Sequence, residues 1–234
     1  LNLSNNFNLK IEPILLKKKI AIELASKKIL VGNNFKWKDY KLKYFKDTED
    51  FESLHRWKWV IKALSQNKIN RSNYKWFLNQ VIIWYKNYNF ENNEKNNLIW
   101  ETYNVSERIC NLIIFSKLLN LKLSKDINII LNNHINYLID NLEFFGENTG
   151  NHIINNARAL YLFGCYYDNK KIIKIGEKIL LNELPKLLDN DNMLNEGSTH
   201  YHFLVQTWLL EIYFFLSQKS KKINPKFLKI IIKM

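Results

Sequence analysis

The sequence predicts an all-α fold built from antiparallel helical hairpins. Of the 234 residues, 47% are hydrophobic and 14% aromatic, whereas only 6 are glycine and 3 are proline. A chain of this length can bury a sizeable core, and this composition is typical of a helical globular protein. From Asp47 onward, apolar residues recur with the 3.6-residue period of a helix, in blocks separated by short polar turns. Short links between successive helices favour antiparallel neighbours.

The periodic blocks define the expected elements in order. Residues 1–46 have a mixed pattern that assigns them no definite structure, apart from the strand-like KKILVG at residues 27–32. Residues 47–234 are expected to form the helical domain. Its eight expected helical blocks are residues 50–66, 72–88, 106–120, 124–145, 151–167, 169–188, 198–218 and 224–234.

Capping and breaking residues mark the ends of these blocks. Serine hydroxyls can accept hydrogen bonds from the first turn of a helix, and four serines stand where helix starts are expected: Ser72, Ser106, Ser124 and Ser198. Pro185 is expected to end or kink the sixth block, because proline lacks the N–H that an internal helical position donates.

Charge and missing motifs narrow the function classes. The formal net charge of +13 attracts polyanions, whether nucleic acid, anionic membrane or acidic polysaccharide, without choosing among them. Cys110 and Cys165 fall inside apolar helical patterns and are expected to be buried and unpaired. The sequence has no glycine-rich phosphate loop, HExxH, GxSxG or CxxC motif, so no cofactor or metal is expected. No uncharged apolar stretch is long enough to span a membrane.

A first candidate site lies in GNHIINNARAL, residues 150–160. On a helix, Asn151, Asn155 and Arg158 share one face. Asn151 would stand at the helix N-terminus, where free N–H groups and the helix dipole favour an anion such as a carboxylate, and His152 can add a donor or a positive charge. The alternative is that Asn151 only caps the helix and His152 only packs against its neighbour.

A second candidate site lies in NEGSTHYH, residues 195–202. With Ser198 as the cap, Tyr201 falls in the first turn, where the helix dipole favours the phenolate and makes the tyrosine a candidate general base. His200 and His202 are two positions apart and point to different sides of a helix, which makes them a poor metal-binding pair. The alternative is a tyrosine whose hydroxyl anchors a contact between helices.

Two upstream segments mix aromatic with basic residues. They are LHRWKW at residues 54–59 and WETYNVSERICN at residues 100–111. Tryptophan suits stacking with sugar rings, and guanidinium groups pair with acidic groups. The candidates for contact with substrate are Arg56, Trp57, Tyr103 and Arg108, although Trp57 could equally belong to the core.

Taken in this order, the segments resemble the N-terminal helical domain of the heparinase II/III-like polysaccharide lyases, a group that includes related alginate lyases. The family pattern has a helix that starts Asn-His, followed by a second Asn and Ala-Leu, and further along an acidic turn and Glu-x-Ser-x-x-Tyr-His. The matching residues are Asn151, His152, Asn155, Ala159, Leu160, Glu196, Ser198, Tyr201 and His202. The similarity runs roughly from Asp47 to the end, and its specificity lies in the combination.

The resemblance implies an incomplete (α/α) toroid, normally followed by a β-sheet domain that this chain lacks. It also implies β-elimination on uronate-containing polysaccharides, with no cofactor. Asn151 and His152 would stabilise the negative charge that develops beside the uronate carboxylate, and Tyr201 would be the base. The residues expected to position substrate are Asn155, His202, Glu196, Arg56, Arg108, Tyr103 and Trp57. Asn192 stands where the family usually has glycine, and asparagine can also adopt the left-handed conformation that this turn needs.

The chain begins without methionine and ends at IIIKM within an apolar pattern, so it is expected to be a fragment of a longer protein. A further catalytic His or Tyr would come from the missing β-sheet domain, and the fragment alone is expected to be inactive. The family implies a periplasmic or secreted location and an acidic polysaccharide partner, with no role for nucleic acid.

Two other functions stay open at this point. One is a non-catalytic carbohydrate-binding relative, and the other is a basic helical scaffold that binds nucleic acid or protein, which only the charge favours. The substrate could be heparan sulfate, alginate or a bacterial surface glycan, since all three undergo the same elimination.

Overall fold

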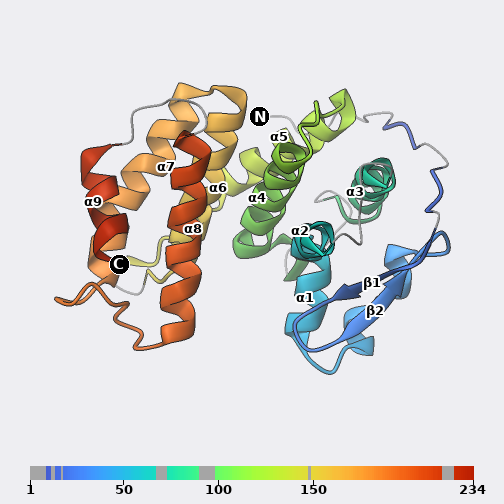
Figure 1. The fold of residues 1–234 in the computed structure, drawn as a ribbon, viewed down its shortest axis with the longest axis horizontal. Coiled ribbons are helices and arrows are strands. Elements are labelled where there is room, and N and C mark those ends of the chain that lie inside the picture. Colours follow the sequence, from blue (N-terminus) through green and yellow to red (C-terminus); the bar gives the residue numbers. More distant parts are fainter. Residues whose placement is uncertain are drawn as a thin grey trace. The chain divides into compact units, whose positions relative to one another are not determined.

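A computed structural model describes residues 9–11, 14–16, 18–66, 73–89, 98–146, 149–217 and 224–234. The chain separates into two compact units, Leu1–Asn136 and Tyr137–Met234. Helices dominate both units, and the strands of the described residues form one two-stranded sheet (Figure 1). The predicted all-α class is confirmed, whereas the predicted domain division at residue 46 stays a prediction. Among the described residues, no helix combines the length and apolar character needed to cross a membrane.

The N-terminal part of the first unit contains a β-hairpin. Strand β1 (Ile20–Glu23) pairs antiparallel with β2 (Lys28–Val31), and Ile20 lies opposite Val31. In β1 the buried residues alternate with partly exposed ones, as expected when one face of a strand packs on a core. Strand β1 contacts α2 (Figure 1). The strand predicted within residues 27–32 is therefore present.

The first unit also contains the helices that carry the LHRWKW and WETYNVSERICN segments. They are α1 (Thr48–Arg56), α2 (Lys58–Ser65), α3 (Tyr74–Tyr88), α4 (Thr102–Leu118) and α5 (Lys125–Asp140), which runs past the boundary between the units. Helix α4 contacts both α1 and α2, so the two segments are brought together.

One predicted helix is broken in two. The block expected at residues 50–66 divides at Trp57, whose φ of 62° lies in the left-handed region and ends α1 before α2 begins. A bulky residue adopts this conformation only when its surroundings compensate for the strain. Here the indole is buried in edge-to-face contact with Trp84, at a ring centroid distance of 5.1 Å. The packing of this side chain overrides the helical period of the sequence.

The serine caps are partly confirmed. Ser124 Oγ accepts a hydrogen bond from the N–H of Ile127, and Ser198 Oγ accepts one from the N–H of Tyr201, each at 3.4 Å. The prediction for Ser106 is wrong, because α4 already begins at Thr102 and places Ser106 in its buried interior. Ser72 lies outside the described residues.

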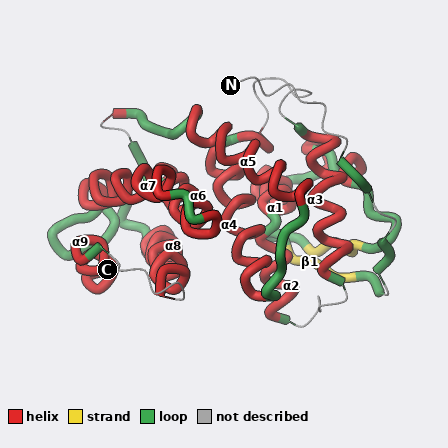
Figure 2. Tube along the Cα trace, turned by 90° about the horizontal axis from the view of Figure 1, so that it is seen from above, coloured by secondary structure: helices red, strands yellow, loops and turns green. Residues whose placement is uncertain are grey.

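The second unit is built around α6 (His152–Tyr167). It packs against α7 (Lys170–Glu183) and α8 (Thr199–Ser217), and α8 contacts α9 (Pro225–Lys233) (Figures 1 and 2). Helix α7 gives way to a 3-10 turn at Leu184–Leu187, which contains Pro185, so the predicted effect of this proline is confirmed. Both cysteines are buried and neither forms a disulfide, also as predicted.

Two glycines allow α6 and α7 to approach closely. A Cβ atom on Gly176 of α7 would lie 2.9 Å from the carbonyl oxygen of Ala157 and 3.0 Å from the backbone nitrogen of Tyr161. A Cβ atom on Gly164 of α6 would lie 2.7 Å from Cγ1 of Ile173. Because backbone atoms cannot move aside as flexible side chains can, the Gly176 contact sets the spacing of the two helices.

We expect Gly176→Ala to lower the free energy of unfolding by about 1–2 kcal/mol, because the clash outweighs the better helix propensity of alanine. Gly150→Ala is the matched control, since no described atom beyond its chain neighbours lies within 4 Å of its Cβ position. Urea denaturation would measure both variants. Equal stability of Gly176→Ala and the parent protein would contradict the packing argument.

Candidate functional site

The two predicted motifs meet at the N-terminus of α6. Asn151 is the N-cap residue, yet its side chain makes no capping hydrogen bond. Its Nδ2 instead donates to Glu196 Oε2 at 3.2 Å, across 45 residues of sequence. The alternative in which the Asn151 side chain only caps its own helix is therefore not what the structure shows. This bond joins NHIIN to the loop that leads into α8.

His152 is held by an acidic residue that the sequence patterns did not single out. Its Nδ1 lies 2.7 Å from Glu143 Oε2, and the side chain of His152 is 52% exposed. The backbone N–H of Glu143 donates to Asn156 Oδ1 at 3.2 Å, so α6 also holds the segment that carries this carboxylate. Carboxylate contact at one imidazole nitrogen fixes the orientation of the ring. The imidazole is thus oriented while half of it faces solvent.

Tyr201 occupies the first turn of α8, as predicted. Its side chain is 45% exposed, and Ser198 caps the turn through the Tyr201 N–H. Glu196, which bonds to Asn151, precedes Tyr201 by five positions in the same segment. An exposed tyrosine in the first turn of a helix is accessible to a polymer.

A closed turn precedes Glu196. Leu188 and Leu194 form an antiparallel bridge, and Asp189 Oδ1 accepts hydrogen bonds from the N–H groups of Asp191 and Met193. Asn192 has φ of 63°, so the left-handed turn predicted at this asparagine is confirmed. The turn fixes the path of the chain into Glu196 and the start of α8.

The two histidines that flank Tyr201 diverge. His200 is exposed, whereas His202 is buried and its Nε2 lies 3.3 Å from the carbonyl oxygen of Met234. The predicted divergence of this pair is confirmed. Within the described part of the chain, no group of three or more His, Cys, Asp and Glu side chains is arranged to hold a metal ion.

An ion pair with a buried arginine links α6 to α8. Arg158 is 2% exposed, and its Nε and Nη2 atoms each lie 2.6 Å from Glu211 Oε2 on α8. Its Nη1 donates to Asn155 Oδ1 at 2.8 Å, and the guanidinium lies over the ring of Trp208. Asn155 and Arg158 thus share one face of α6, as predicted, but this face is buried. The contact with substrate predicted for Asn155 stays a prediction, as does that for His202.

In the first unit, Arg56 is enclosed by its own polar network. It contacts Glu49, donates to Glu52 Oε2 at 3.0 Å and donates to Asn104 Oδ1. Its guanidinium lies 4.7 Å from the ring centroid of Tyr103, so two predicted substrate residues are neighbours. Burial raises the pKa of Glu52, an effect that Arg56 partly offsets.

Arg108 lies in a cage of tryptophan rings. Its guanidinium is 4.5 Å from the ring centroid of Trp84, 5.3 Å from Trp100 and 5.9 Å from Trp57. Its Nε donates to His134 Nε2 at 3.0 Å, which requires the proton of His134 to sit on Nδ1, where the carbonyl oxygen of Ile130 accepts it. Trp57 is 1% exposed, which matches the core alternative. The substrate contacts predicted for Arg56, Tyr103, Arg108 and Trp57 stay predictions.

Two buried histidines make the first unit sensitive to acid. Burial, reinforced by Arg108, holds the pKa of His55 and that of His134 well below 6.5. Both remain neutral in the folded state, whereas the unfolded chain binds a proton at each below about pH 6.5. The contribution of these two neutral histidines to stability is therefore fully present above this pH and is lost as the pH drops below it.

We expect each histidine to add about 1.4 kcal/mol per pH unit to this loss of unfolding free energy. Urea denaturation between pH 7.5 and 5.5 would show a shallower pH slope for His134→Gln, whatever its stability at pH 7.5. The matched control is His200→Gln at an exposed histidine. An unchanged slope in His134→Gln would contradict the assignment.

These features define a class of protein, a helical-hairpin domain that presents an amide, an oriented imidazole and a phenol at the starts of two adjoining helices. The family model described as Heparinase II/III N-terminus matches residues 5–234, and the chain belongs to this family. The family membership predicted from the motifs is confirmed. No curated protein matches the chain.

Solved structures show the same fold. Heparinase III is 23% identical with a TM-score of 0.61, and the match covers 86% of this chain and 32% of that protein. Heparan sulfate lyase HepC from Pedobacter heparinus is 21% identical with a TM-score of 0.62, covering 89% of this chain and 34% of the lyase. The chain spans about a third of the length of these proteins. The expected helical domain class is thus supported by structures as well as by the family model.

Proposed function

We propose that this chain is the helical part of a lyase that cleaves uronate-containing acidic polysaccharides by β-elimination. The observation that carries the proposal is the hydrogen bond from Asn151 to Glu196, which joins the start of α6 to the loop ahead of Tyr201. The family membership and the heparan sulfate lyase among the structural neighbours support the same reaction class.

The reaction requires a proton to leave C5 of a uronate whose carboxylate is already charged. Removing this proton places a second negative charge on the carboxylate, so the barrier falls only if the site stabilises that charge as it develops. Asn151 can donate to the carboxylate, and His152, held by Glu143, can supply a further donor with positive charge. The dipole at the N-terminus of α6 acts in the same direction.

Tyr201 is the proposed base. Its phenolate takes the C5 proton, and the electron pair of the C5–H bond forms the double bond between C4 and C5. The C4–O bond breaks, and its oxygen leaves with the bonding pair. This oxygen receives a proton, for which the Tyr201 hydroxyl formed in the first step is the candidate donor. The products are one unsaturated sugar end and one new hydroxyl end.

The proposal includes a partner that this chain does not contain. The solved relatives are about three times as long, and the family resemblance implies that a further His or Tyr comes from a β-sheet domain. We propose that this domain completes the site around the substrate. Activity is therefore expected from the full-length protein and not from this chain alone.

Incubation of the full-length protein with heparan sulfate, alginate and other uronate polymers tests the proposal. The absorbance of the unsaturated product should rise with at least one of them. Binding without any rise would favour a non-catalytic carbohydrate-binding relative. Salt-dependent binding of nucleic acid, without binding of uronates, would favour the basic scaffold instead.

A further inference from the structure

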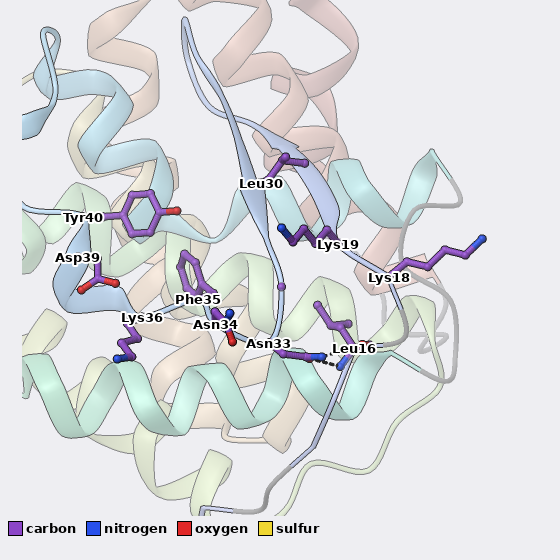
Figure 3. Close-up of a pocket in the computed structure, with 11 residues that line it drawn as sticks. Leu16, Lys18, Lys19, Leu30, Asn33, Asn34, Phe35, Lys36, Asp39 and Tyr40 are labelled. Carbon is purple, nitrogen blue, oxygen red and sulfur yellow. Dashed lines mark hydrogen bonds between the residues drawn. The ribbon is translucent and has the colours of Figure 1, made fainter.

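A cavity of about 640 Å³ lies in the first unit, beside the β-hairpin (Figure 3). Its volume falls in the range of about 300–1,000 Å³ typical of pockets for small ligands. The residues that line it come from the segment before β1, from β2 and from the turn after β2. None of them belongs to the elements that carry Asn151, His152 or Tyr201.

The lining is strongly basic. Lys18, Lys19 and Lys36 line the cavity together with a single acidic residue, Asp39. Within the described part of the chain, none of these three lysines forms a salt bridge with a carboxylate. Lysine ammonium groups that gather around a concave surface, without acidic partners, focus positive potential into it. An anion that enters would find several donors of charge-assisted hydrogen bonds.

The backbone around the cavity is held in place by specific contacts. Asn33 accepts a hydrogen bond from the N–H of Leu16 at 2.6 Å and donates to the carbonyl oxygen of Leu16 at 3.1 Å (Figure 3). This pair fixes the segment that leads into Lys18 and Lys19. A Cβ atom on Gly32 would lie 3.0 Å from Cγ of Lys19, so the absence of a side chain leaves room for the lysine stem. Hydrogen bonds and close packing therefore fix the backbone near Lys18 and Lys19.

An aromatic pair adds an apolar wall. The rings of Phe35 and Tyr40 have centroids 5.2 Å apart, and Phe35 also packs edge-to-face on Trp37. Figure 3 shows the Tyr40 hydroxyl and the Lys19 side chain directed toward one another, whereas Lys18 extends outward. Burial, with a smaller contribution from Asp39, raises the pKa of Tyr40, so its hydroxyl keeps its proton and can donate a hydrogen bond. Cations beside an aromatic wall are suited to a sugar ring that carries a negative group.

We propose that this cavity is an accessory site that binds an anionic sugar unit, with the carboxylate or sulfate contacted by Lys19 and with Lys18 and Lys36 at the rim. The choice of an anionic sugar as ligand rests on the proposed function. A concave cavity of this volume with one aromatic wall favours a single sugar unit over the extended basic track that nucleic acid requires. The site would hold a long polymer at a second point without taking part in bond cleavage.

The test compares two triple variants of the full-length protein. One carries Lys18→Gln, Lys19→Gln and Lys36→Gln. The other carries Lys41→Gln, Lys58→Gln and Lys75→Gln, which removes the same charge from exposed lysines of the same unit that do not line the cavity. Calorimetric titration at 0.15 M salt would measure the affinity for a uronate-only tetrasaccharide, for a sulfated tetrasaccharide and for a neutral one.

We expect the cavity variant to lose affinity for at least one anionic tetrasaccharide by about 10-fold or more, and the control variant to stay within about twofold of the parent. The two anionic ligands show whether a carboxylate alone suffices or a sulfate is needed. An equal loss in both variants would overturn the site, because net charge alone would then explain binding. Tighter binding of a single-stranded oligonucleotide through the same lysines would overturn the choice of ligand.

This outcome is independent of the elimination reaction. A Tyr201→Phe protein should bind the tetrasaccharides as the parent does, and the cavity variant should keep kcat within about twofold at saturating polymer. If the parent protein showed no turnover and only the cavity variant lost binding, the lyase proposal would be rejected and the accessory site would stand. If the parent protein showed turnover and the cavity variant bound the tetrasaccharides as the parent does, the accessory site would be rejected and the lyase proposal would stand.

Discussion

Tyr201→Phe in the full-length protein should lower kcat for uronate polymers by about 10²–10⁴-fold, because phenylalanine keeps the ring and removes the oxygen that accepts the C5 proton. Tyr201 is exposed on the first turn of α8, so the loss of its hydroxyl leaves no buried polar group without a partner. Folding should therefore be unaffected. The absorbance of the unsaturated product gives kcat, and calorimetric titration gives substrate affinity.

Tyr213→Phe is the matched control, since it makes the same change further along the same helix. It should leave kcat within about twofold of the parent, as expected for a residue that no step of the reaction uses. A Tyr201→Phe protein that turned over substrate as fast as Tyr213→Phe would exclude Tyr201 as the base. The lyase itself would then need another proton acceptor, and the β-sheet domain would be the place to seek it.

Arg158→Met should lower the free energy of unfolding of the second unit by about 2–4 kcal/mol. The arginine is buried and bonds both Glu211 and Asn155, so its removal leaves a carboxylate and an amide oxygen without their cation. Methionine fills much of the same volume, which separates the loss of charge from the creation of a cavity. Urea denaturation followed by circular dichroism would measure the change.

Lys186→Met provides the contrast, because it breaks a pair with Glu183 whose cation is 67% exposed and should cost less than about 1 kcal/mol. Adding Glu211→Gln to Arg158→Met should recover part of the loss, since the uncompensated carboxylate is then neutral. If Arg158→Met were as stable as Lys186→Met, the buried pair would contribute no more than a surface contact. The link that it makes between α6 and α8 would then be unimportant for holding the helix starts together.

Helical periodicity predicted most of the fold because it is a local property of the chain. The blocks that became α6 and α7 agree with their predicted ranges to within a few residues, and Pro185 ends α7 as expected. Periodicity failed at Trp57, where a buried ring forces a left-handed backbone inside an apolar pattern. It also failed at Ser106, because a serine in a helix interior has the same sequence appearance as a cap.

The candidate site was only partly accessible to sequence reasoning. Asn151, His152 and Tyr201 were found because they follow helix-start signals and because the motifs resemble a known family. Glu143 was missed, since the apolar period placed it inside the helical block predicted at residues 124–145, whereas α5 ends at Asp140 and Glu143 meets His152 from the link that follows. Glu211 was missed for a related reason, as one of several polar residues along an apolar helix, and only its contact with Arg158 distinguishes it.

The sequence by itself determined the helical class, the starts of α6 and α8 and the family, because period, capping and motif order are written along the chain. Tertiary structure alone decided which of these residues meet. The bond between Asn151 and Glu196, the buried pair of Arg158 and Glu211, and the basic cavity beside the β-hairpin each join residues whose separation in sequence carries no signal. Such contacts depend on packing in three dimensions, where the burial of one side chain sets the position of the next.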